Sequence, residues 1–303
     1  LGRLYRQVQP DLVHLYTIKP ALYGGLMARL LGTAPYVATI PGRGWVFTTA
    51  PGLTGRVLRR GVGMAYRLAL GGARCRAIFE NPDDRNFFVD QAFVAADQAQ
   101  LILGCGVDPA RYRPLPRPSG GCARVVFPSR MLRDKGVAEF VAAARRLRAG
   151  GVAAEFVLLG LPDPGNPDSL TEQELAAWNA AGAVQWWGYR QDMPEILAAT
   201  DIVCLPTSYG EGVPRILIEA AACGCALIAA DRPGCREIVR DGVNGLLVPP
   251  RDADALAQAL ETLLANPERC QRMGQAGRTR VIEQFTEAHV VAQTLAVYEE
   301  LAG

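Results

Sequence analysis

Long hydrophobic runs are missing from this chain of 303 residues. None approaches the ~18 consecutive apolar residues that a membrane-spanning helix requires. Histidine is scarce, with two in the chain, and the eight cysteines have neither the spacing of disulfide-linked loops nor that of a zinc site. Several of them, such as Cys204, Cys223 and Cys225, fall inside apolar segments, where we expect buried free thiols. The sequence therefore argues against a transmembrane protein, a disulfide scaffold and a metal centre.

Acidic residues are absent between Asp11 and Glu80, a stretch that holds nine arginine and lysine residues. Residues 1–121 carry fifteen basic and seven acidic side chains, whereas the remainder carries seventeen basic and twenty-three acidic ones. A charge division of this kind predicts an anionic partner for the first part of the chain.

Strand-like apolar segments alternate with helical ones, an order that predicts an α/β fold with parallel sheets. A stretch rich in glycine and proline suggests a linker at residues 114–122. We expect one Rossmann-like domain at 1–113, a second at 123–285, and a final helix at 286–303 that returns to the first. The first domain offers four strand candidates, fewer than such a domain usually has, so we expect that one or two N-terminal βα units are missing.

A strand, a glycine-containing loop and a helix form the most informative segment. Apolar runs at Asp201–Leu205 and Cys225–Ala229 predict two strands, and Pro214 suits the first turn of the helix between them. Free backbone N–H groups at such a helix N-terminus can bind a phosphate. Glu211 in the loop and Glu219 on the helix can accept hydrogen bonds from the paired hydroxyls of a sugar or ribose. An ordinary helix-capping loop with a surface ion pair is the alternative.

Seven residues separate the two glutamates, and Ala-Ala-Ala-Cys-Gly and later Gly-Val-Asn-Gly-Leu-Leu-Val-Pro-Pro-Arg-Asp follow them. This pattern resembles the group 1 (family 4) retaining glycosyltransferases, and the resemblance covers essentially the whole chain. It implies the GT-B fold of two facing Rossmann-like domains, here with the N-terminal domain incomplete. Four further segments are similar to bacterial transferases that build oligosaccharides on undecaprenyl-diphosphate: Thr17-Ile-Lys-Pro, Thr39-Ile-Pro-Gly-Arg-Gly, Asn81-Pro-Asp-Asp-Arg and Asp192-Met-Pro.

The resemblance implies roles for particular residues. Arg130 and Lys135 would hold the donor diphosphate, because fixed cations favour the negative charge that grows as the glycosidic bond breaks. Glu219 would accept hydrogen bonds from the ribose hydroxyls, and Glu211 would contact the donor sugar. The catalytic residues implied are thus Arg130, Lys135 and Glu211. We expect Lys135 at the start of a helix, Lys135–Leu147, and a solvated basic turn is the alternative for the two cations. The other donor-binding residues implied are Gly188, Tyr189, Gly212, Val213 and Pro214.

No metal or other cofactor is expected besides the nucleotide-sugar donor. Asp252 and Asp254 spell the DxD of metal-dependent transferases, but Asp252 precedes an apolar helix and is better explained as its cap. Pro41 stands where many family members carry a histidine, so the catalytic base stays unassigned. We expect His14 to be a core residue rather than a catalytic one.

A membrane-facing surface is predicted between residues 43 and 76. Four arginines share one face of the helix expected at Leu53–Leu70, and two aromatic residues lie in the loop before it. We expect this surface to hold the protein reversibly on anionic lipid at the cytoplasmic face of the plasma membrane, with an ordinary solvated helix as the alternative. The predicted membrane face comprises Trp45, Phe47, Arg56, Arg59 and Arg60, with Arg67 on the same helix face.

The function that these features predict is a retaining, metal-independent glycosyltransferase. It would move a sugar from a nucleotide-diphosphate donor, a UDP-linked N-acetylhexosamine or hexose, to a lipid-diphosphate-linked saccharide in cell-surface polysaccharide assembly. Two alternatives stay open: a non-catalytic nucleotide-sugar-binding remnant, and a transferase with a soluble acceptor. A dehydrogenase is disfavoured because no G-x-G-x-x-G follows a strand. A sugar-nucleotide epimerase would want acids and histidines in the cleft, and the chain has only two histidines. No nucleic-acid partner is expected.

Overall fold

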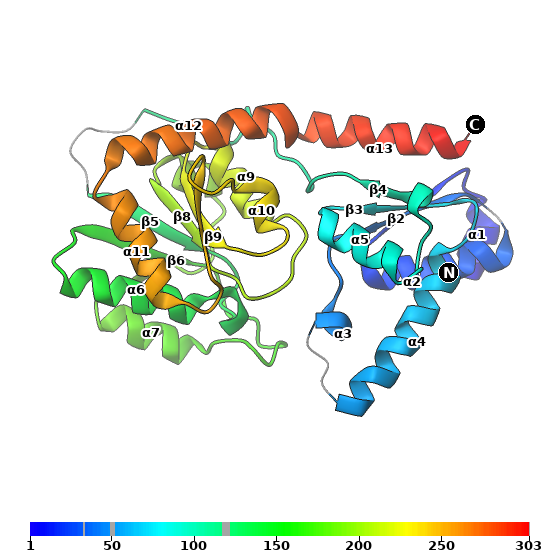
Figure 1. Cartoon of the computed structure of the whole chain (residues 1–303), viewed down its shortest axis with the longest axis horizontal. Coiled ribbons are helices and arrows are strands. Elements are labelled where there is room, and N and C mark those ends of the chain that lie inside the picture. Colours follow the sequence, from blue (N-terminus) through cyan, green and yellow to red (C-terminus); the bar gives the residue numbers. More distant parts are fainter. Residues whose placement is uncertain (33, 49–51, 117–121, 303) are drawn as a thin grey trace. The chain divides into compact units, whose positions relative to one another are not determined.

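The computed structural model of the chain describes residues 1–32, 34–48, 52–116 and 122–302 (Figure 1). Contacts divide the chain into two units, so the boundary falls after Gly106 and not at residue 113 as expected. Both sheets are entirely parallel, which confirms the predicted α/β class. The first unit consists of Leu1–Gly106, Gly210–Val213 and Glu287–Gly303, and the second of Val107–Tyr209 and Pro214–Thr286.

The first unit is built on a four-stranded sheet. Strands β1, β2 and β3 stay in register to their carboxyl ends, where Tyr16 pairs with Thr39 and Thr39 with Ile78. The loops that follow these strands therefore meet at one edge, which is where parallel sheets bind ligands. In spatial order the strands are β1 (Val13–Tyr16), β2 (Tyr36–Ile40), β3 (Cys75–Phe79) and β4 (Ala99–Leu101).

Helices cover both faces of this sheet. One face packs on α2, α4 and α5, with an aromatic cluster that includes Tyr66, Phe79 and Phe88. The opposite face presents Val37 and Ile78 to the last helix, α13, through Val297. The helices of this unit are α1 (Gly2–Val8), α2 (Ile18–Leu31), α3 (Trp45–Thr48), α4 (Gly52–Leu70), α5 (Pro82–Asp90), the 3₁₀ turn Ala96–Gln98 and α13 (Glu287–Ala302).

The second unit holds a six-stranded parallel sheet in the order β10-β9-β8-β5-β6-β7. Alternate residues point to opposite faces: Val125 and Phe127 belong to the core under α6 and α11, whereas Val126 packs towards α8. The strands are β5 (Ala123–Pro128), β6 (Ala154–Leu159), β7 (Gln185–Trp186), β8 (Ile202–Leu205), β9 (Ala226–Ala230) and β10 (Gly245–Val248).

Helices of the second unit connect these strands, except α11 and α12, which follow the last strand; α6 lies beside α11 (Figure 1). They are the 3₁₀ turn Arg133–Lys135, α6 (Val137–Ala149), α7 (Glu172–Ala180), α8 (Met193–Ala198), α9 (Arg215–Ala222), α10 (Cys235–Ile238), α11 (Ala253–Leu264) and α12 (Pro267–Gln284). In the described part of the chain, no helix has both the length and the apolar character needed to cross a membrane. Cys204, Cys223 and Cys225 are buried free thiols, as predicted.

Three local predictions were wrong. Pro214 is the N-cap of α9 and not part of its first turn, since its ψ of 115° is extended. The helix expected from Lys135 begins at Val137, because Gly136 adopts a left-handed φ of 87° between the 3₁₀ turn and α6. Phe47 lies in the short helix α3 rather than in a loop.

Candidate functional site

A hollow of about 580 Å³ opens at the carboxyl ends of β5, β6 and β7 in the second unit. The loops after these three strands line it, together with Ile216 from α9. Of the predicted donor residues, Arg130 and Tyr189 lie in its wall, whereas Gly188 contributes a carbonyl that accepts a hydrogen bond from the Gly160 N–H at 2.8 Å. The lining also includes Ser129, Leu161, Asp163, Arg190 and Met193.

Arg130 is the most accessible cation of this hollow. Its side chain is 60% exposed, and its Nη1 donates to Asp163 Oδ2 at 2.7 Å. Backbone bonds from Met131 N–H to the Leu161 carbonyl, and from Leu170 N–H to the Met131 carbonyl, hold the loop that carries Asp163. An exposed pair of this kind stabilises a protein by only ~0–1 kcal/mol, so a ligand with two phosphate charges can take Arg130 from Asp163.

Lys135 is buried, with 7% of its surface exposed, and its Nζ lies 5.2 Å from the centre of the Tyr209 ring. The turn that presents it depends on Gly136, where an added Cβ would meet the Pro206 carbonyl oxygen at 2.5 Å. The Asp134 carbonyl accepts the Ser208 N–H at 2.7 Å, which fastens the same turn to the loop after β8. Lysine is rarely buried, so a cation held this firmly is a candidate group for binding an anion.

Glu219 is also buried, with 8% of its surface exposed. Its Oε1 accepts a hydrogen bond from Arg215 Nε at 2.8 Å, one turn earlier on α9, so the two residues share a helix face. Burial raises the pKa of Tyr112 to about 12, and the neighbouring Glu219 carboxylate adds to this effect. Arg215 therefore fixes one oxygen of Glu219. The same carboxylate lies next to the Tyr112 hydroxyl, which stays protonated.

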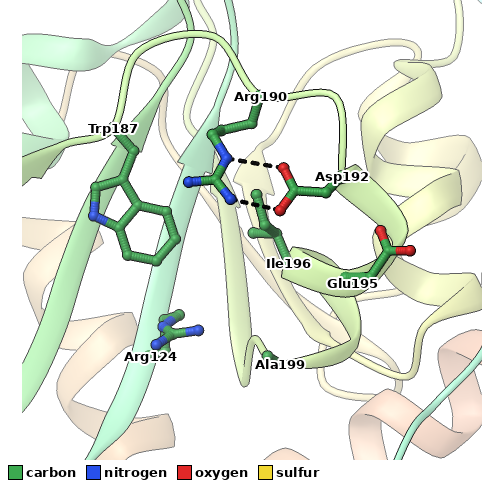
Figure 2. Close-up of a pocket in the computed structure, with 7 residues that line it drawn as sticks. All are labelled: Arg124, Trp187, Arg190, Asp192, Glu195, Ile196 and Ala199. Carbon is green, nitrogen blue, oxygen red and sulfur yellow. Dashed lines mark hydrogen bonds and ion pairs between the residues drawn. The ribbon is translucent and has the colours of Figure 1, made fainter.

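A second hollow, of about 510 Å³, lies between Trp187 and α8 (Figure 2). Two of the residues that line it, Arg190 and Asp192, point toward each other and form two hydrogen bonds, at 2.8 and 2.5 Å (Figure 2). Arg124, which pairs with Glu155 at 2.5 Å, places its guanidinium carbon 5.2 Å from the Trp187 ring centre. Both guanidinium groups thus have carboxylate partners. Because Arg190 lines both hollows and Tyr189 lines the first, the loop that carries them borders both hollows.

Glu80, which the sequence did not lead us to select, is a buried carboxylate of the first unit. It follows β3, is 5% exposed, and accepts hydrogen bonds from the Tyr16 hydroxyl at 3.0 Å and the Val213 N–H at 3.1 Å. Burial raises its pKa; the two donors oppose that shift, and the charges of Asp84 and Glu211 add to it. It is the first acid after a long acid-free stretch and directly follows an apolar strand, which was the available signal.

The loop residues Glu211, Gly212 and Val213 belong to the first unit by their contacts. Asn81 Nδ2 donates to the Glu211 carbonyl at 3.5 Å, and its Oδ1 caps α5 by accepting the Asp84 N–H. The Val213 N–H, which we predicted for the donor, is bound to Glu80 in this structure. Donor binding through that group would therefore require its release.

His14 is exposed, so the prediction of a core histidine was wrong. Its Nδ1 lies 2.6 Å from the Tyr298 hydroxyl of α13 and its Nε2 lies 2.7 Å from Thr39 Oγ1 of β2. Desolvation of the ring lowers the pKa of His14. His14 thus links its own strand, β1, to the neighbouring strand β2 and to helix α13.

Helix α4 presents a mixed face to solvent. Arg56 and Arg60 are exposed beside Val57, which is 66% exposed, and beside Met64 and Leu68. Arg59 is only half exposed and has an interaction partner, so it belongs at the edge of this face. We name the set Arg56, Val57, Arg60, Met64 and Leu68 the α4 face.

Two predicted members of the membrane surface do not join the α4 face. Phe47 packs against Tyr66, Phe87 and Phe93, with ring centres 5.4–6.1 Å apart, so its ring is committed to the core. The side chain of Trp45 lies outside the described residues.

The DxD-like pair has structural partners. Asp252 is the N-cap of α11 and accepts the Ala255 N–H at 2.8 Å, which confirms the predicted cap. Asp254 forms an ion pair with Arg146. No cluster of three or more metal-binding side chains occurs among the described residues.

Comparisons with known proteins agree with this architecture. A family model described as "Glycosyl transferases group 1" matches residues 117–280, and one described as "Glycosyl transferase 4-like" matches residues 1–75. The chain is 38% identical over 194 residues to an alpha-maltose-1-phosphate synthase of Mycolicibacterium smegmatis, covering 59% of this chain and 48% of that protein.

Another relative is the N,N'-diacetylbacillosaminyl-diphospho-undecaprenol alpha-1,3-N-acetylgalactosaminyltransferase of Campylobacter jejuni. It is 32% identical over 177 residues, which are 58% of this chain and 44% of that protein. The chain spans about half the length of the curated relatives it matches.

Among solved structures, Anabaena HepE in complex with UDP has a TM-score of 0.80 and 20% identity, with coverage of 98% of this chain and 81% of that chain. At this identity the likeness concerns the fold. Two parallel sheets of this kind, and the family match over residues 117–280, show that the chain has the GT-B fold and belongs to the group 1 glycosyltransferases.

Proposed function

We propose that this chain carries out retaining transfer of a sugar from a nucleotide-diphosphate donor. The observation that carries the proposal is the concentration of donor-type groups in the second unit: a hollow with Arg130 and Tyr189 in its wall, a buried cation at Lys135 and a buried carboxylate at Glu219. The hollow would take the nucleobase, Glu219 the ribose and the two cations the diphosphate.

The chemistry follows from these charges. As the bond between sugar and diphosphate breaks, a second negative charge develops on the leaving group. Arg130 and Lys135 stabilise that charge more than the ground state, and Lys135 is already held in place, so little reorganisation is required. Glu211 contacts the sugar hydroxyls. The leaving phosphate oxygen takes the acceptor proton, and neither a metal ion nor another cofactor takes part.

UDP is the nucleotide we propose, because the structural neighbour HepE, which has the same fold, was solved in complex with UDP. The sugar would be an N-acetylhexosamine or a hexose. The acceptor we propose is a lipid-diphosphate-linked saccharide in the assembly of a cell-surface polysaccharide, in line with the resemblance to the Campylobacter relative. A soluble acceptor, or a remnant that binds the donor without turnover, are the alternatives.

The α4 face supports a lipid-linked acceptor. A row of apolar side chains flanked by arginines suits the headgroup layer of an anionic membrane, with the arginine heads staying in water. We therefore propose that the protein works as a peripheral protein on the cytoplasmic face of the plasma membrane.

The test is a donor screen. Calorimetry should detect UDP binding, with the same affinity after treatment with chelator, and transfer from one UDP-sugar to a lipid-diphosphate-sugar should follow. If UDP does not bind, the proposal fails. Binding of UDP without transfer to any lipid-linked or soluble acceptor would mean that the chain is a non-catalytic remnant. Transfer only to a soluble sugar would mean that the acceptor is soluble and that no membrane is involved.

A further inference from the structure

We propose that Glu80 is a positioning residue for the segment Gly210–Val213, and that it sets the place of Glu211 by holding the Val213 N–H. This inference rests on the proposed function only in that Glu211 contacts the donor sugar. It adds a residue of the acceptor-side sheet to the groups that determine turnover.

The carboxylate of Glu80 has both oxygens engaged. Oε1 accepts the Tyr16 hydroxyl at 3.0 Å and Oε2 the Val213 N–H at 3.1 Å. A carboxylate with 5% of its surface exposed is stable only when such bonds replace its lost water. The segment and the carboxylate therefore stabilise each other, and removal of either leaves the other with an unsatisfied polar group.

Gly212 gives independent evidence that this contact is tight. An added Cβ there would lie 2.1 Å from Glu80 Oε2 and 2.8 Å from the Pro41 carbonyl oxygen. Since the Pro41 carbonyl is backbone and Glu80 is buried, neither group can move aside easily. The segment can approach Glu80 this closely only because residue 212 has no side chain.

Asn81 provides a second connection, from its Nδ2 to the Glu211 carbonyl at 3.5 Å. The segment is thus held on both sides of Gly212, by adjacent residues at the end of β3. The other charged groups near Glu80 are Glu211 and Asp84, whose carboxylate pairs with Arg43 at 2.6 Å. Two neighbouring negative charges favour protonation of Glu80, which would remove one of its two acceptor oxygens.

The experiment compares Glu80→Ala, Glu80→Gln and Gly212→Ala in the full chain. We expect UDP affinity to stay within about twofold of the wild type, because the nucleotide contacts lie in the second unit. For Glu80→Ala and Gly212→Ala, kcat should fall on the order of 10- to 100-fold, as expected for a displaced catalytic group. The double variant should lose little more than either single one, since both disrupt the same contact.

Glu80→Gln keeps the shape and one acceptor oxygen, so it should recover part of kcat and fold even if Glu80→Ala does not. Its activity should also lack the fall at acidic pH that protonation of Glu80 gives the wild type. Asp83→Asn, an exposed carboxylate on α5, is the matched control. Unchanged kcat in Glu80→Gln and Gly212→Ala, or equal losses of UDP affinity and kcat, would overturn the inference. Failure of the wild type to bind UDP would instead count against the proposed function.

Discussion

The two cationic side chains of the candidate site differ in how firmly the protein holds them. Lys135 is held by the turn around Gly136, whereas Arg130 is exposed and shared with Asp163. Binding a phosphate would therefore cost different amounts of free energy at the two cations. Lys135 is already held in place, whereas Arg130 must exchange its carboxylate partner for the phosphate.

Removal of either cation should therefore affect turnover more than nucleotide affinity. Lys135→Ala is expected to lower kcat/KM by a factor that corresponds to a loss of about 2–4 kcal/mol of transition-state stabilisation. Arg130→Ala should lower kcat/KM less, towards the lower end of the same range. Steady-state kinetics with the donor sugar measure both values. Asp163→Asn, which frees Arg130, should bind UDP slightly more tightly. Equal kcat/KM for the wild type and both alanine variants would disprove the assignment.

The two glutamates of the motif should separate binding from turnover. Glu219→Ala removes the group proposed for the ribose, so calorimetry should show weaker binding of UDP. Glu211→Ala should leave UDP binding nearly intact and reduce transfer. A matched loss of UDP affinity in both variants would mean that this division of roles is wrong.

At the scale of helices and strands, the sequence predicted some elements well and others not at all. Strands β8 and β9 and helix α4 were predicted to within one residue of their observed bounds, because the strands are continuous apolar runs and the helix has a clear period. The short helices α1, α3 and α10 and the strand β10 were missed, since four to seven residues give too little periodicity to distinguish them from loops.

The candidate site was predictable where its residues are close in sequence. Arg215 and Glu219 are one turn apart, and their pairing follows from helix geometry. The bond between Glu80 and Val213 joins residues 133 positions apart. No local pattern specifies such a contact, because it depends on where the end of β3 lies after folding.

The attachment of α13 to its sheet through His14 should depend on pH. The pKa of His14 is lower in the folded state than its usual value near 6.5. Its contribution to stability is therefore complete above about pH 6.5 and is lost as the pH falls through the folded pKa. Thermal melts between pH 7.5 and 5.5 should show a larger loss in Tm for the wild type than for His14→Gln.

Gln7→Ala, a change at an exposed position of α1 that adds and removes no titratable group, should keep the wild-type pH dependence. Glu80, whose pKa is raised on folding, contributes with the opposite sign and is unchanged in both variants, so it cancels from the comparison. Identical slopes for the wild type and His14→Gln would contradict the prediction.

The α4 face should bind anionic vesicles in a manner sensitive to salt. Arg56→Gln with Arg60→Gln removes about 2 kcal/mol of attraction, so binding should weaken on the order of 30-fold. Binding of the wild type should fall steeply as salt rises past ~0.15 M, and UDP affinity should not change. The pair Arg145→Gln and Arg272→Gln, which removes the same charge from α6 and α12, should bind like the wild type. Equal affinity for neutral and anionic vesicles would exclude this role.

At the scale of the whole molecule, the chain passes between its two units four times: after Gly106, Tyr209, Val213 and Thr286. Neither unit is a continuous stretch of sequence. The first takes the segment Gly210–Val213 and helix α13 from parts of the chain that follow most of the second.

The position of α13 has a consequence for synthesis on the ribosome. Strands β1 to β4 emerge early, but the helix that covers Val37 and Ile78 is translated only after the second unit. At rates of ~5–20 residues per second, the intervening stretch takes roughly 10–40 s to make. Throughout that interval one apolar face of the nascent sheet stays uncovered. We expect chaperones to bind this face until α13 covers it. The first unit begins to form first and is completed last.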